Sequence, residues 1–310
     1  MGVPDWLAVY LKGFAMGAAD AVPGVSGGTI ALIAGIYDRL VSAIAAIDVA
    51  GVLALLGALA RPHDPASRQR FREDFVAMDL PFLLVLAIGV VSAALTAANV
   101  IHWAVGVHAG PTYAFFFGLI VASAIVLRRE MDLREPAGWA VAATGFGLAF
   151  WVSGLSNGSL GSGLLVLFFA GVVGISAMVL PGISGSLILL TLGQYETIVS
   201  AVGDLTDAVF ALTLSPAIDP LTTLVVFATG ALLGILSFAR VVAWALSTYR
   251  THTMTFLVAL MIGALRAPGE RVLEATATWT PTTGAILLAW ALLGAVLVLG
   301  LDWATGEIAY

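Results

Sequence analysis

The chain has 310 residues, of which 60% are hydrophobic and only 10% are charged. Soluble domains carry about 25% charged residues, so this composition indicates an all-α protein that crosses the membrane several times. The net charge of −6 then belongs to segments outside the lipid and says little about a substrate. The absence of cysteine excludes disulfides and thiolate chemistry, and the four scattered histidines offer no metal cage. We therefore expect no metal, no other cofactor and no nucleic-acid partner. The first twelve residues lack a basic region and a cleavage site, so we expect no signal peptide.

In chain order, residues 5–36 form two apolar arms around a Pro-Gly break, and residues 37–60 continue as an apolar stretch. An Arg-rich loop follows at 61–72. A second break lies within 164–193, with a trailing apolar arm that reaches about residue 215. Six further hydrophobic segments have about the length needed to cross a bilayer. They are residues 80–101, 112–127, 137–153, 222–248, 253–267 and 284–301.

The sequence around the first break recurs around the second. DAVPGVSGGTIALIAGIY at 20–37 matches MVLPGISGSLILLTLGQY at 178–195, at an offset of 158. Over the 31 positions that begin at Gly13, 13 residues are identical, against about three expected from composition, which indicates duplication. We therefore predict two repeats, 1–153 and 154–310, within a single membrane domain.

Basic residues mark the cytoplasmic ends of membrane helices, so we place the Arg-rich loop at 61–72 on that side. Two crossings later, the same rule places a second basic group there: Arg128, Arg129 and Arg134. A short loop with His102 and His108 would lie outside. The loop after the second break is acidic and is also placed outside; it contains Asp204, Asp207 and Asp219. Equivalent loops of the two halves then lie on opposite sides, which predicts inverted repeats with both termini in the cytoplasm.

This topology requires an even number of crossings between residues 5 and 60. Either a re-entrant hairpin turns at 23–28 and residues 37–60 do not cross, or a broken helix crosses and 37–60 returns. The short apolar arms on either side of the break favour the hairpin.

The two broken segments are the candidate substrate site. In hydrocarbon, an unpaired backbone group costs several kcal/mol, so non-helical backbone persists only against protein or a wet cavity. A glycine-rich loop that opens a helix offers N–H groups and a partial positive charge, which favour an anion such as phosphate. The alternative is that the small residues only allow tight helix packing. The first break lacks the Gly-Lys-Ser/Thr ending of a nucleotide P-loop. The candidate residues are Pro23, Gly24, Ser26, Gly27, Gly28, Thr29, Pro181, Gly182, Ser184, Gly185 and Ser186.

Ionisable residues within membrane segments are functional candidates by default. Lys12 and Asp20 flank the first break and, eight residues apart, lie nearly on one helix face. Arg39 could meet a phosphate, and Asp20 or Glu196 could take up a proton. Alternatively, Lys12 reaches the headgroups, and Arg39 and Glu196 are interfacial. We expect Asp20 to be protonated when phosphate binds, or to pair with Lys12 or Arg39.

The sequences ADAVPGVSGGTIALIAGIYDRL and MVLPGISGSLILLTLGQYETI resemble the signature of the polyprenyl-phosphate transporter family (PopT). TYAFFFGLIVASAIVL at 112–127 and TMTFLVALMIGALRAP at 253–268 extend the resemblance over most of the chain. It implies a plasma-membrane transporter, not an enzyme. The cargo would be a polyprenyl phosphate carrier lipid, undecaprenyl phosphate or its archaeal counterpart, returned from the outer to the cytoplasmic leaflet. The second loop has Ser186 in place of Gly28 and no acid in place of Asp20, which argues against a strictly symmetric mechanism.

The residues alone leave two other functions open. One is a secondary transporter of a small soluble anion, with the same loops but an aqueous path. The other is a membrane lipid phosphatase, although the sequence lacks the His-Arg-Ser cluster of a phosphohistidine mechanism. Because no nucleotide motif is present, transport would be coupled to an ion such as H⁺ or Na⁺, to the membrane potential or to mass action.

Overall fold

A computed structural model describes residues 6–20, 26–60, 63–154, 163–185, 188–189, 192–210 and 218–304. Within these residues every regular element is a helix, which confirms the all-α prediction. Three of the described helices are long and apolar enough to cross a membrane, or up to five spans are present if each of two bent helix pairs counts as one. The prediction of a multi-pass membrane protein is therefore confirmed.

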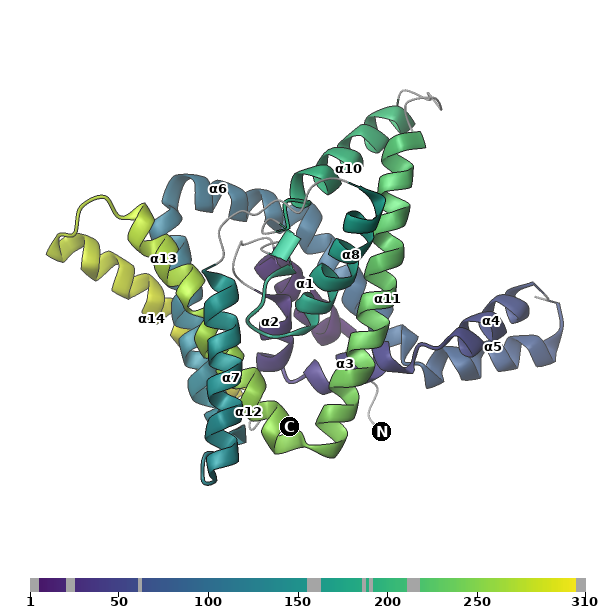
Figure 1. The fold of residues 1–310 in the computed structure, drawn as a ribbon, viewed down its shortest axis with the longest axis horizontal. Coiled ribbons are helices and arrows are strands. Elements are labelled where there is room, and N and C mark those ends of the chain that lie inside the picture. The colour runs from purple at the N-terminus through teal and green to yellow at the C-terminus, as the bar shows by residue number, and fades with distance from the viewer. Residues whose placement is uncertain are drawn as a thin grey trace.

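Figure 1 shows the arrangement of the helices. In the first half they are α1 (Trp6–Asp20), α2 (Gly27–Ile33), α3 (Tyr37–Ala46), α4 (Val49–Leu59), α5 (Pro65–Ala77), α6 (Leu80–Leu127), the 3₁₀ turn η1 (Arg128–Glu130) and α7 (Pro136–Ser153). In the second half they are α8 (Leu164–Val179), α10 (Tyr195–Phe210), α11 (Ile218–Thr248), α12 (Arg250–Ala264), α13 (Arg266–Ala275) and α14 (Pro281–Ala304). The core lies where α2, α3, α6 and α12 meet, since the following side chains are at most 2% exposed: Leu32, Tyr37, Val41, Phe82, Ile120, Leu127, Leu257, Leu260 and Met261.

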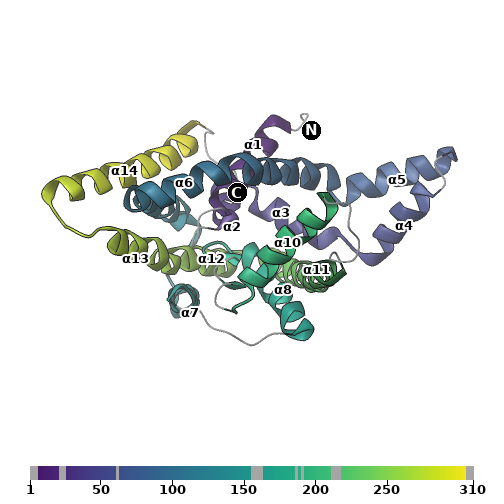
Figure 2. The same cartoon turned by 90° about the horizontal axis from the view of Figure 1, so that it is seen from above.

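The prediction of a loop at 61–72 is wrong, because from residue 65 onward this segment is helix α5. Asp64 caps the helix by accepting a hydrogen bond from the N–H of Ala66, and Pro65 occupies the first turn, where a missing N–H costs nothing. The acidic loop is likewise replaced by helix: Asp204 and Asp207 lie in α10, and Asp219 lies in the first turn of α11. Together α4 and α5 form a hairpin that projects sideways from the helical body (Figure 2).

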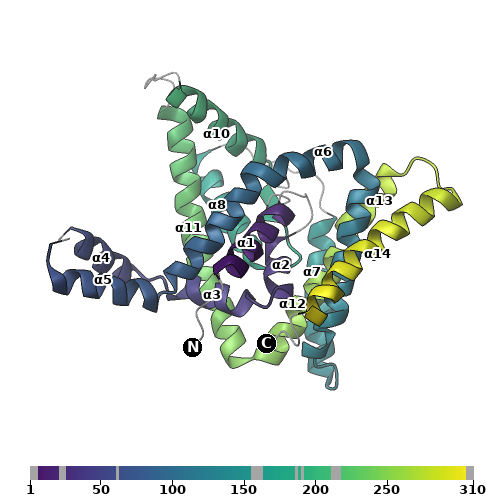
Figure 3. The same ribbon diagram turned by 180° about the vertical axis from the view of Figure 1, so that it is seen from behind.

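The predicted outer loop with His102 and His108 is also absent, because both residues belong to α6. This helix is interrupted by a kink at His108, whose φ of −130° and ψ of 49° are not helical. Pro111 follows three residues after His108. It lacks an N–H and its ring crowds the preceding turn, which bends the helix without ending it. The Thr112 hydroxyl bonds to the carbonyls of Ala104 and His108 and so links the helix across the kink. Figure 3 shows α6 changing direction.

Helix packing in the two halves corresponds position by position. The most extensive packing in the first half joins α1 to α6, and the equivalent contact in the second joins α8 to α11. A methyl group added to Gly13 would lie 2.2 Å from the carbonyl oxygen of Leu86, and one added to Gly171 would lie 2.4 Å from that of Phe227. Gly13 and Gly171 differ by the repeat offset of 158. Glycine is required at both positions because two helix backbones meet there.

A second pair of helix contacts also matches between the two halves and also has glycine at the closest approach. Helix α6 packs against α14, and α12 packs against α7. A methyl group on Gly294 would lie 2.1 Å from the carbonyl oxygen of Phe115, and one on Gly145 would lie 2.6 Å from that of Phe256. These matched contacts support the duplication. The opposite orientation of the two repeats in a bilayer stays a prediction.

That orientation can be tested by thiol labelling, since the chain has no native cysteine. Because arginines cluster in α5, we expect a cysteine at Arg70 to be protected from a membrane-impermeant reagent added outside intact cells. A cysteine at Asp204, which is exposed on α10, is expected to react. Both should react after the membrane is permeabilised. Labelling of both or of neither in intact cells would contradict the inverted arrangement.

Candidate functional site

Helix α2 lies antiparallel to α1. The N–H of Gly27 at the start of α2 donates to Oδ1 of Asp20 at 2.6 Å, and Nζ of Lys12 donates to the carbonyl of Ala34 beyond its end at 2.8 Å. Asp20 lies at the end of α1, and Lys12 lies about 12 Å earlier along the helix axis. The chain therefore reverses direction at the break. This geometry is that of a hairpin at the break; whether the hairpin is re-entrant in the bilayer stays a prediction.

Both charged residues of α1 complement the dipole of α2. A helix favours negative charge at its N-terminus and positive charge at its C-terminus, where Asp20 and Lys12 respectively lie. Lys12 and Asp20 therefore each bind α2 and not each other.

The N–H groups at the start of α2 are bonded within the chain. Gly27 donates to Asp20, and Gly28 donates to the side-chain oxygen of Ser26 at 3.2 Å. Ser26 has extended backbone geometry and is the N-cap residue of the helix. An anion could reach these N–H groups only by replacing Asp20 or the Ser26 hydroxyl.

The second broken segment lies directly against the first. The Ser26 hydroxyl donates to the carbonyl of Leu180 at 3.3 Å, and the N–H of Gly182 donates to the Thr29 hydroxyl at 2.8 Å. The Tyr37 hydroxyl donates to the carbonyl of Val179 at 2.9 Å. Hydroxyl groups of the first half thus partner backbone groups at the end of α8 and just beyond it. We call these three bonds the inter-loop contacts.

Glycine is required where the two segments approach other backbone. Gly182 has a φ of 85°, which side-chain-bearing residues rarely adopt, and an added methyl group would lie 2.9 Å from the Leu260 carbonyl oxygen. A methyl group on Gly28 would lie 3.1 Å from the carbonyl oxygen of Met178. Gly27 and Gly28 therefore allow both the Asp20 contact and the close approach of the second segment.

The structure brings together most of the residues predicted at the breaks. Ser26, Thr29 and Ser184 are 2%, 1% and 4% exposed, respectively. The residues described at this junction are Ser26, Gly27, Gly28, Thr29, Pro181, Gly182, Ser184 and Gly185. Pro23, Gly24 and Ser186 lie outside the described residues.

The other two predicted charged residues have different surroundings: Arg39 forms an ion pair, and Glu196 is exposed. The Arg39 guanidinium forms two bonds to the Asp79 carboxylate, at 2.6 and 2.9 Å, and lies 4.2 Å from the centre of the Phe82 ring. Glu196 is exposed in the first turn of α10, and no ion pair within the described residues includes it. The structure thus connects Arg39 to the start of α6.

Sequence reasoning missed two connections between the halves. Asp38 on α3 pairs with Arg250 at the start of α12, and Arg240 on α11 donates to the carbonyl of Ile47 at the end of α3. Helix α3 is therefore fixed to the second half at both of its ends. The predictions also omitted Tyr37, although the alignment of Tyr37 with Tyr195 was available as a signal. The two tyrosines differ in burial: Tyr37 is 2% exposed and Tyr195 is 38% exposed.

Residues 16–283 match a protein-family model described as undecaprenyl phosphate translocase-like. The chain belongs to this family. The match spans both breaks and the inter-loop contacts, and it confirms the resemblance seen in the sequence.

Two family relatives are named polyprenyl-phosphate transporter. The one from Vibrio cholerae serotype O1 is 37% identical over 263 residues, which cover 84% of this chain and 77% of the relative. The one from Staphylococcus aureus is 29% identical over 274 residues, which cover 84% of this chain and 85% of the relative. No solved structure matches the chain.

The tyrosine pair gives a matched test of the inter-loop contacts. Tyr37→Phe removes only the hydroxyl that bonds to Val179, whereas Tyr195→Phe removes an exposed hydroxyl from the equivalent position of the other repeat. Because a buried carbonyl loses its partner, we expect Tyr37→Phe to destabilise the protein by about 1–3 kcal/mol and to reduce transport several-fold. Tyr195→Phe should change neither. Thermal unfolding in detergent and initial transport rates in proteoliposomes measure the two effects. If the two variants unfolded at the same temperature and transported at the same rate, the Tyr37 hydroxyl would have no role in transport at the junction.

Proposed function

We propose that this protein returns polyprenyl phosphate from the outer to the cytoplasmic leaflet of the plasma membrane, with the phosphate held at the junction of the two broken helices. The observation that carries the proposal is the direct bonding of the two breaks through Ser26, Thr29 and Tyr37. Membership of a translocase-like family and the names of the two relatives support the lipid class.

The chemistry of the junction suits a lipid phosphate. Such a lipid has one anionic head that needs a polar path, while its apolar tail can remain in the bilayer. The junction gathers hydroxyl and N–H donors within an apolar helical body, and such donors bind phosphate oxygens strongly when the acceptor is charged. Broken helices in matching places of two repeats are also the usual position of substrate sites in secondary transporters.

Asp20 provides the link between phosphate binding and proton uptake. Its carboxylate and a phosphate oxygen would be alternative partners of the Gly27 N–H, which now donates to Asp20. Protonation would remove the negative charge of Asp20, weaken that bond and remove the repulsion of an incoming phosphate. In this scheme H⁺ is the coupling ion, and each phosphate that enters the junction is accompanied by one proton on Asp20. A sodium-coupled mechanism is the alternative.

The bonds that fix α3 to the second half would close one side of the pathway. Asp38–Arg250 and Arg240–Ile47 join the halves near the end that we assign to the cytoplasm. Glu196, which occupies the place of Asp38 in the second repeat, has no ion pair within the described residues. This asymmetry supports a state closed towards the cytoplasm, and opening would require these bonds to break.

The proposal is tested by a leaflet-exposure assay in proteoliposomes with fluorescent polyprenyl phosphate. We expect the lipid to leave the outer leaflet in a protein-dependent way, and unlabelled lipid phosphate to compete while inorganic phosphate and sulfate do not. Competition by the soluble anions with no lipid movement would favour the soluble-anion transporter. Release of inorganic phosphate from polyprenyl pyrophosphate would favour the phosphatase.

A further inference from the structure

The α4–α5 hairpin has no part in the proposed transport site, yet it extends well beyond the helical body (Figures 1 and 2). Its two helices pack against each other, and Gly51 of α4 contacts Met78 just after α5. Each helix begins with an aspartate cap, Asp48 and Asp64. These contacts and caps hold the hairpin in one conformation, although it lies outside the proposed transport site.

Helix α4 exposes an apolar surface. None of its 11 residues is charged, and the large side chains Val52, Leu53, Leu56 and Leu59 are 39%, 61%, 57% and 59% exposed. At about 100° per residue, the exposed positions surround more than half of the helix. With a length of about 16 Å, α4 is too short to cross a hydrocarbon core of about 30 Å. An apolar surface of this kind marks a place where lipid or protein covers the chain.

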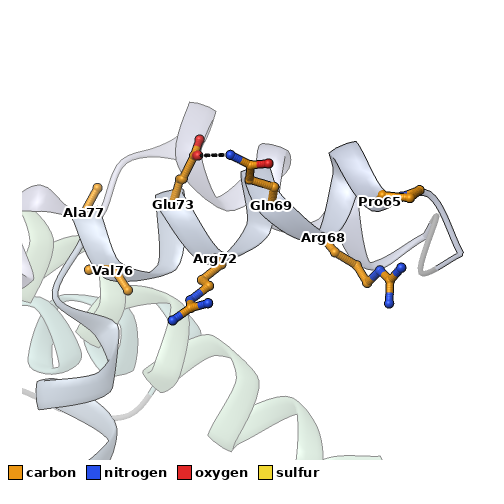
Figure 4. A pocket seen from close by; sticks show the side chains of 7 residues that line it. All are labelled: Pro65, Arg68, Gln69, Arg72, Glu73, Val76 and Ala77. Atoms are coloured by element: carbon orange, nitrogen blue, oxygen red, sulfur yellow. Dashed lines mark hydrogen bonds between the residues drawn. The ribbon is translucent and has the colours of Figure 1, made fainter.

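Helix α5 is polar and has no buried residue. It carries three arginines within five positions, of which Arg68 and Arg72 are one turn apart and line a groove along the helix (Figure 4). The figure shows these two side chains pointing to one side, while Gln69 and Glu73 point to the other and bond to each other at 2.9 Å. So many charges exclude α5 from the hydrocarbon.

We infer that the α4–α5 hairpin lies in the plane of the bilayer surface and binds anionic lipid headgroups. In this arrangement α4 is buried at the boundary between headgroups and acyl chains, and Arg68 and Arg72 contact lipid phosphates from the aqueous side. Interfacial helices bind by this combination of buried apolar area and basic side chains. A second copy of the chain would cover only a stripe of α4, whereas lipid covers its whole exposed arc. The inference depends on the membrane location of the chain and not on its substrate.

Site-directed spin labels on the full-length protein in liposomes test the position of α4. The labels would be placed on single cysteines at Leu56, at Gln69 and, as a lipid-facing reference, at Leu293 of α14, which is 52% exposed. We expect the labels at 56 and 293 to be accessible to oxygen and several-fold less accessible to a water-soluble nickel complex than the label at 69. A label at 56 as accessible to nickel as that at 69 would overturn the inference. So would spin–spin broadening at 56 that disappears when the protein is diluted in lipid, since that result indicates a second copy.

The charge requirement is tested by comparing phosphatidylcholine vesicles with vesicles that also contain phosphatidylglycerol. We expect the anionic lipid to reduce nickel accessibility at 69 several-fold. Arg68→Gln with Arg72→Gln should remove this difference, whereas the matched control Arg70→Gln, two positions from each on another side of α5, should preserve it. No dependence on anionic lipid in the unmodified protein, or an equal loss in the control, would overturn the role of Arg68 and Arg72.

Discussion

Cross-linking position 38 to position 250 is expected to stop transport completely. Asp38 and Arg250 form an ion pair between α3 of the first half and α12 of the second. If these helices separate whenever the site opens to the cytoplasm, a covalent bridge between them prevents that step. The double variant Asp38→Cys/Arg250→Cys, treated with a cleavable bis-thiosulfonate reagent that matches the reach of the ion pair, makes this bridge. Transport is then measured by leaflet exposure before and after treatment.

The same sample provides the main control, because a reducing agent cleaves the bridge and should restore the rate. Each single cysteine variant, treated in the same way, should retain its untreated rate. The chain has no native cysteine, so no background bridge can form within it. Quantitative cross-linking with unchanged transport would show that α3 and α12 stay together throughout the cycle, and the gate would then have to lie elsewhere.

The sequence predicted those features of the fold that depend on composition over many residues. Long apolar runs indicated the spans at 112–127, 222–248 and 284–301, which fall in helices long enough to cross a membrane, and Pro-Gly clusters indicated the two breaks. The wrong predictions concern segments whose structure depends on one or two residues. Asp64 and Pro65 start a helix in the polar segment that was predicted as a loop. Pro111 lies just after the kink at His108 and does not end α6, and the Thr112 hydroxyl bonds across the kink to the carbonyl of Ala104.

The candidate site could be predicted only in part. The residue types at the breaks indicated a polar site, but their bonding depends on contacts between positions about 150 residues apart, such as Thr29 with Gly182. Tyr37 and Tyr195 occupy the same place in the repeat, and nothing local in the sequence distinguishes the buried one from the exposed one. Nor could the sequence reveal that Lys12 and Asp20 bind the two ends of α2, since this requires the reversal of the chain at the break.

Asp20→Asn is expected to abolish the pH dependence of transport while leaving lipid phosphate binding intact. Asparagine keeps an oxygen that can accept from the Gly27 N–H, so α2 remains capped, but it cannot bind or release a proton. If protonation of Asp20 admits the phosphate, transport by the unmodified protein should rise as the pH falls. For a single proton the change approaches about tenfold per pH unit above the titration range. The Asn variant should show a constant rate over the same range.

Two further variants separate the proton from the hydrogen bond. Asp20→Ala leaves the Gly27 N–H without its partner, and an unsatisfied buried group costs about 1–3 kcal/mol, so this variant should unfold at a lower temperature as well as transport poorly. Asp48→Asn is the matched control: Asp48 also caps a helix, accepting from the N–H of Gly51 at 2.6 Å, but it is exposed and lies at the start of α4. It should retain the full pH dependence.

These variants distinguish three roles for Asp20. A flat pH profile with normal binding in Asp20→Asn supports proton coupling at α2. Loss of binding in Asp20→Asn would instead mean that the negative charge itself is needed, for example to hold α2 in the position that Lys12 fixes at its other end. An unchanged pH profile would remove Asp20 from coupling and leave it as a structural cap. In that case Glu196, which is exposed in the first turn of α10, is the next residue to replace.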